Sequence, residues 1–178
     1  MSQVFSEINK INNAYTPGVS SSGVAAAPGN AAYETDTLHL ENYKNATFIV
    51  TMGTAVAATH WNFKVMAGSA NTTGTGAATP INFYYRAQGT TDTAYVDDIP
   101  GALTAGTSDG IDTTTGYVGG VVIIEVDAPT VAAAGTNYDH VKLHITGTTA
   151  ADAPRAISIV AILSEPRYPQ AVLATAID

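Results

Sequence analysis

The chain contains no cysteine, and its 178 residues include only 7 lysines and arginines against 15 acidic residues. Without cysteine the chain can form neither disulfide bonds nor thiolate metal sites, so its stability has to come from packing and assembly. The formal net charge of -8 repels polyphosphates, and basic side chains form no cluster along the sequence. We therefore expect no nucleic acid among its partners.

Long apolar runs and frequent charges are missing as well. The longest apolar stretches, such as 121–124, fall far short of the about 18 residues that a membrane-spanning helix needs. Only 12% of the residues are charged, whereas alanine, threonine and glycine are abundant. This composition favours strands and turns over exposed helices stabilised by ion pairs, and we expect no membrane among the partners.

The sequence does contain a clear alternation of apolar and polar residues. Apolar side chains recur at every second position in four segments, which places them on one face of a β-strand. These inward residues are Phe48, Val50 and Met52; Trp61, Phe63 and Val65; Ile81, Phe83 and Tyr85; and Val141, Leu143 and Ile145. Shorter alternations at 38–40 and 94–96 indicate weaker strands.

Two further segments, 121–126 and 157–163, carry apolar residues on both faces. One face of an antiparallel sheet can remain in water, so a strand that is apolar on both faces needs cover on both sides. A second sheet, a terminal segment or a neighbouring subunit can supply that cover. We assign the outward residues to a candidate interface, while a central strand of a sandwich explains the same pattern; they are Val121, Ile123, Val160 and Ile162.

The spacing of these segments predicts an all-β protein. Strands recur every roughly 15 to 20 residues with glycine, threonine, serine and proline between them, and no long segment of helical period intervenes. The expected fold is an antiparallel β-sandwich or jelly roll over residues 37–165. An N-terminal arm or linker, 1–36, and a C-terminal arm, 166–178, flank this domain.

Both predicted arms carry apolar side chains that need a partner. In the first arm Val4, Phe5, Ile8 and Ile11 fall on one side of one or two helical turns. In the second, two prolines favour extended backbone, and apolar residues follow at Tyr168, Val172 and Leu173. Contact with another subunit and folding back onto the same domain both account for these residues.

Residues 106–110 match the letters of a nucleophile elbow around Ser108, and Asp127 and His140 follow in the order of an α/β-hydrolase. The elbow requires a strand that turns sharply into a helix, whereas glycine, threonine and aspartate flank Ser108 on both sides. Asp97 and Asp98 are typical of a turn, and Glu125 and Asp127 of the end of a strand. We therefore expect no enzyme and no cofactor.

The spacing of two histidines is typical of a metal site on a helix but not of one on a strand. His140 and His144 have the spacing that chelates zinc on a helix, but on a strand their rings lie roughly 13 Å apart. The sequence predicts solvated or interface histidines here. His39 lies near a strand end without neighbours that suggest a cluster, so we predict no metal site.

Tyr84 and Arg86 project from the same outward face of one predicted strand. An aromatic plane and a guanidinium group in that arrangement can form a binding hot spot. The ordinary polar decoration of a surface strand is the alternative.

Several strand segments together resemble the small head proteins of tailed bacteriophages: 46–54, 63–68, 83–86, 121–127 and 138–143. Residues 161–168, an apolar strand that continues into a Pro-Arg-Tyr tail, extend this resemblance to about 38–168. The resemblance implies a capsid decoration or cement protein that clamps neighbouring major capsid subunits from outside the virion after synthesis in the host cytoplasm. It also implies a homo-oligomer, commonly a trimer, and carries over no catalytic residue.

Two other classes of function remain as alternatives. A carbohydrate-binding or adhesin module would use the threonine- and glycine-rich loops at 68–80 and 101–119 together with Tyr84. A hydrolase would use Ser108 or the carboxylate pairs.

Overall fold

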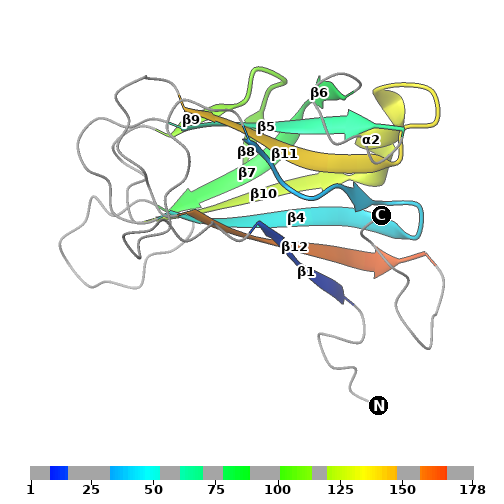
Figure 1. Cartoon of the computed structure of the whole chain (residues 1–178), viewed down its shortest axis with the longest axis horizontal. Helices are drawn as coiled ribbons and strands as arrows, with labels where there is room; N and C mark the ends of the chain where they lie inside the picture. Colours follow the sequence, from blue (N-terminus) through cyan, green and yellow to red (C-terminus); the bar gives the residue numbers. More distant parts are fainter. Residues whose placement is uncertain are drawn as a thin grey trace, which may run out of the picture.

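The computed structural model describes residues 9–15, 33–52, 61–69, 78–88, 101–113, 120–147 and 157–167. These residues form strands in two antiparallel sheets that face each other (Figure 1). The all-β antiparallel sandwich that the sequence predicts is therefore confirmed. Within the same ranges, no helix is long and apolar enough to cross a membrane.

Both sheets consist of six strands. The first sheet contains, in spatial order, β1 (Asn9–Tyr15), β12 (Ile157–Pro166), β4 (Tyr43–Met52), β10 (Val121–Asp127), β7 (Phe83–Gln88) and β8 (Thr104–Gly106). The second contains β2 (Tyr33–Glu34), β11 (His140–Gly147), β5 (Trp61–Gly68) and β6 (Thr79–Ile81), with β3 (Leu38–His39) paired to β11 and β9 (Ile111–Thr113) paired to β5.

The core lies between the sheets and contains the predicted inward side chains, except that Tyr85 is only partly buried and packs against it. Phe48, Val50, Phe63, Val65 and Leu143 are completely buried. Burying an aliphatic or aromatic side chain of this size stabilises a fold by about 1.5–3 kcal/mol, so the alternation of period two determines which face of each strand turns inward.

The segment around residue 82 departs from the single strand that its alternation predicts. It divides into β6 in the second sheet and β7 in the first, although Ile81 and Phe83 are both buried as expected. A short crossing between sheets preserves the inward direction of both residues, so the pattern alone does not reveal it.

Helix α2 (Ala128–Ala133) directly follows β10 and was not expected from the sequence. Asp127 caps it, because its Oδ1 accepts a hydrogen bond of 2.8 Å from the Thr130 amide. Ala128 and Val131 are buried and join the core, so this short helix covers one end of the sandwich (Figure 1).

Residues 9–15 form an edge strand, so the prediction of helical turns that include Ile11 is wrong there. Pairing with β12 satisfies backbone groups that a marginal isolated helix would leave exposed to water. The remaining predicted arm residues that carry apolar side chains lie outside the described residues: Val4, Phe5, Ile8, Tyr168, Val172 and Leu173. The weak strand at 94–96 also lies outside them.

Candidate functional site

The outward face of the first sheet carries the interface residues that the sequence predicts. Residues directly opposite each other in an antiparallel ladder point to the same side of a sheet. The register places Val160 opposite Ile49, and Ile49 opposite Ile123 on the next strand. Three neighbouring strands therefore form a continuous row of branched apolar side chains.

A second row runs parallel to the first. Ile11 on β1 lies opposite Ile162 on β12, and Ile162 lies opposite Thr47 on β4. Ile11 is 51% exposed, and the other apolar residues of these rows are half-buried. We call the outward apolar residues the apolar band: Ile11, Ile49, Val121, Ile123, Val160 and Ile162.

Charged side chains are absent from the outward positions 45–51 of β4 and 158–164 of the adjacent β12, although Lys44 and Glu165 form an exposed ion pair at the end of these strands. The outward positions of β4 are Asn45, Thr47, Ile49 and Thr51, and those of β12 are Ser158, Val160, Ile162 and Ser164. Ile49 was not assigned to the interface from the sequence, although its outward position between two threonines follows from the alternation. These positions of β4 and β12 therefore present only apolar and uncharged polar groups, whereas Glu125 on β10 and Arg86 on β7 bring charge to the neighbouring part of the face.

Tyr84 and Arg86 lie on the same outward face, as their spacing predicts, but they serve different purposes. Tyr84 is 55% exposed and lies between Glu125 on β10 and Ala105 on β8. The Arg86 Nη1 donates a hydrogen bond of 3.2 Å to the carbonyl oxygen of Gly101. Arg86 therefore ties the segment before β8 to the sheet, while Tyr84 offers its ring to solvent.

An open groove of about 770 Å³ lies beside Tyr84, where the outward face meets the start of α2. Exposed Leu103 and Tyr84 line it together with polar side chains from β4, β10, β12 and α2 and from the residues next to β7 and β8. Those polar side chains include Asn45, Thr47, Asn82, Thr107, Glu125, Asp127, Thr130, Ser164 and Glu165. An aromatic ring surrounded by carboxylates, amides and hydroxyls suits a polar ligand with an apolar face.

The three residues of the hydrolase-like pattern each make contacts with other residues and not with one another. Ser108 is exposed in the loop before β9, and its amide donates to the Asn82 Oδ1. Asp127 caps α2, and His140 lies in the second sheet beside Asp139. None of these contacts joins the Ser108 hydroxyl to an imidazole, so Ser108, Asp127 and His140 do not form a hydrolytic triad.

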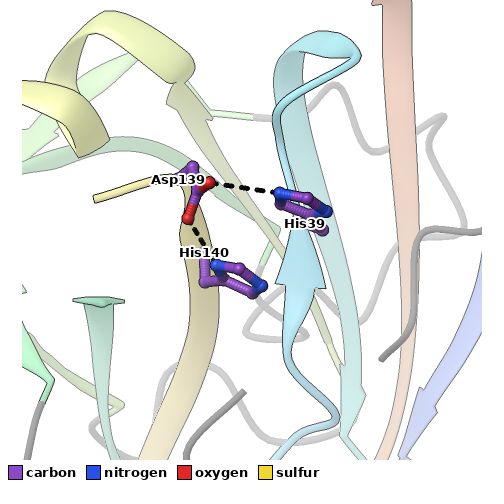
Figure 2. Close-up of side chains that lie close together, drawn as sticks. All are labelled: His39, Asp139 and His140. Carbon is purple, nitrogen blue, oxygen red and sulfur yellow. Dashed lines mark hydrogen bonds and ion pairs between the residues drawn. The ribbon is translucent and has the colours of Figure 1, made fainter. Parts of the chain in front are cut away.

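A histidine cluster in the second sheet corrects two expectations from the sequence. His140 is only 6% exposed, so it is not a solvated histidine, and His39 does have histidine and acidic neighbours. The two rings stack with centroids 4.3 Å apart and planes 9° apart. Figure 2 shows Asp139 beside the pair of rings, with one carboxylate oxygen directed at a nitrogen of each ring.

The sequence could not reveal this cluster, because His39 and Asp139 are 100 positions apart. Pairing between β3 and β11 places His39 directly opposite His140. His144 contacts Glu34 at 3.2 Å instead, and the same Glu34 pairs with the buried Lys142. The two histidines of β11 therefore belong to different clusters. In the part of the chain that the structure describes, His39, Asp139 and His140 form a group that could hold a metal ion.

The fold and these surfaces define an antiparallel β-sandwich whose outward face carries an apolar band across β1, β12, β4 and β10. No protein-family model matches the chain, and no curated protein matches it either.

Proposed function

We propose that this chain is a non-enzymatic structural protein that decorates the outside of a phage head and stabilises contacts between major capsid subunits. The observation that carries the proposal is the apolar band across β1, β12, β4 and β10. The resemblance of the strand segments to small phage head proteins supports the same function. Localisation on the virion and binding to the major capsid protein are parts of this proposal.

The composition of the outward face supports an interface with a second copy of the chain. The centres of protein interfaces are depleted of charge and enriched in apolar side chains, and β4 and β12 present no charged residue there. Burying the partly exposed apolar band would stabilise association by about 25 cal/mol per Å² of apolar surface removed from water. We propose a homo-oligomer, with a trimer favoured by the resemblance.

Solution mass and head binding test this proposal. Light scattering on the purified protein should give a multiple of the chain mass, and the protein should sediment with heads that lack decoration. The double variant Ile49→Thr with Ile123→Thr keeps β-branched side chains but removes apolar surface from the centre of the band. We expect it to remain folded and to weaken self-association by about tenfold or more.

The matched control is Leu103→Thr, which makes the same kind of change at an exposed residue outside the band. This variant should associate like the unmodified protein. A monomeric protein that does not bind undecorated heads would contradict the proposal.

Binding of carbohydrate is a second candidate, and the groove beside Tyr84 is the observation that favours it. The exposed ring can stack on a sugar, while Asn82 and Glu125 line the same groove and can accept or donate hydrogen bonds. A glycan array should then give signals that Tyr84→Ala abolishes and Tyr84→Phe retains. An array without signals would leave the decoration proposal as the only one.

A further inference from the structure

The backbone fixes the positions of His39, Asp139 and His140 independently of their side chains. His39 and His140 are directly opposite in the ladder between β3 and β11. The Leu40 amide donates to the Asp139 carbonyl oxygen at 2.7 Å, and the Asp139 amide donates to the Gly68 carbonyl oxygen at 3.1 Å. Two of the side-chain donors are thus mounted on paired strands, and the third, Asp139, directly precedes β11 and is held by backbone hydrogen bonds, a rigid support of the kind a ligand site requires.

The donor atoms of these residues are close enough to share one ion. One ligand atom from each of the three residues lies within 4.8 Å of the other two. His39 Nε2 is 3.2 Å from Asp139 Oδ2, and two donors bound to one zinc ion at about 2.0–2.2 Å are roughly 3.3 Å apart. His140 Nδ1 is 2.5 Å from Asp139 Oδ1, so these two atoms have to move apart by about 1 Å before both can bind the ion.

Ring orientation shows what else must move. Parallel rings cannot both direct a nitrogen lone pair at one ion between them, because that lone pair lies in the plane of each ring. The two rings, whose planes are only 9° apart, therefore have to rotate away from parallel before both can bind one ion. This requires rotation of the side chains but no change in the strand pairing. The shared carboxylate, which contacts both rings, marks the edge where the ion enters.

Glu41 lies beside His39 and adds a fourth donor once its exposed side chain turns toward the ion. Its Oε2 is 3.7 Å from His39 Nε2, and its side chain is 66% exposed. Two neutral imidazoles and two carboxylates carry two negative charges, which balance a divalent cation. Imidazole nitrogens favour first-row transition metals over magnesium and calcium, both of which prefer all-oxygen sites.

Burial follows the order expected for a site that opens to solvent on one side. The side chains of His140 and His39 are 8% and 22% exposed, whereas that of Asp139 is 40% exposed. The imidazoles thus lie on the inner side, and the carboxylates line the path by which an ion arrives. The overall charge of -8 also favours cations near the protein.

We infer that His39, Asp139 and His140, with Glu41, bind a divalent first-row transition metal, for which Zn²⁺ is the probe. The bound ion clamps the short β3 strand to β11. In a chain without cysteine, this clamp takes the structural role that a disulfide bond has elsewhere. The inference does not depend on the proposed function, because it concerns the stability of the second sheet.

The test uses the full chain after treatment with a chelator. Calorimetric titration should show one Zn²⁺ per chain, and the thermal unfolding midpoint should rise with Zn²⁺ and fall again when the chelator is restored. Co²⁺ should produce visible absorption bands that Zn²⁺ displaces. His39→Gln and Asp139→Asn should each lower the affinity for Zn²⁺ by about tenfold or more.

Two variants keep the test decisive. His144→Gln removes a histidine of the same strand that lies in the other cluster, and it should leave Zn²⁺ affinity unchanged. Glu41→Gln changes an exposed side chain without affecting the core, so it should fold and bind Zn²⁺ more weakly. Absence of binding by the unmodified chain would overturn the inference, and so would equal affinity in the His39→Gln or Glu41→Gln variant.

Discussion

Asn12 places a side-chain amide in the interior, beneath the edge of the first sheet. It is 6% exposed, and its Nδ2 has no hydrogen-bond partner among the described residues. A buried donor without a partner costs about 1–3 kcal/mol, so Asn12→Leu, which has nearly the same shape, should raise the free energy of unfolding by about 1 kcal/mol. Urea denaturation measures this change. A loss of stability would show that the amide has a partner after all.

Tyr43 makes the stability of the fold sensitive to alkaline pH. Burial raises the pKa of its hydroxyl above the usual value. The folded state holds this proton more tightly than the unfolded state. The stability that the protonated hydroxyl adds to the folded state is therefore complete below the unfolded pKa of about 10 and is lost as pH rises through the folded pKa.

Tyr43→Phe removes that ionisation. We expect denaturation curves recorded between about pH 8 and 11 to show a smaller loss of stability in this variant than in the unmodified chain. The same slope in both proteins would mean that another group causes the alkaline loss.

At the scale of elements, α2 depends on the cap that Asp127 supplies, because a helix this short is not stable by itself. Asp127→Ala removes the acceptor for the Thr130 amide and should lower the free energy of unfolding by about 1 kcal/mol. Asp127→Asn keeps an acceptor at the same place and should lose much less. Chemical denaturation of the three proteins separates these outcomes; equal losses would assign the effect to charge and not to the cap.

The sequence predicts a strand correctly where the alternation of apolar residues within that one segment identifies it. The alternation in 47–52 and 61–65 identifies β4 and β5 and their inward faces, because burial acts on each strand separately. The alternation does not predict β1, which forms a strand because it pairs with β12. It does not predict α2 either, whose start depends on one aspartate. The histidine cluster also escapes, because it arises from pairing between distant parts of the chain.

At the scale of the whole molecule, the outward face predicts how association responds to salt. The central positions of β4 and β12 carry no charge, so screening has little to weaken there. We expect the solution mass to stay the same between about 0.05 M and about 1 M sodium chloride. Light scattering at both concentrations checks this. Dissociation at high salt would assign the interface to charged side chains elsewhere on the surface.

The outward apolar residues show which part of the candidate site follows from the sequence. Four outward residues of β10 and β12 lie on one continuous face, as the two-sided pattern predicts. Which face of a two-sided strand meets the opposite sheet is decided by packing across the whole sandwich. The sequence therefore predicts that an apolar outward face exists, while the register between strands determines that its members form rows.

The antiparallel pairing of β1 with β12 has a practical consequence. Asn9 lies opposite Ser164, so the first described strand starts where the last one is ending (Figure 1). Cargo fused before β1 and cargo fused after β12 would thus emerge from one edge of the sandwich, next to each other. A display scaffold built on this protein could present two halves of a split reporter there and join them only when the sheet is complete.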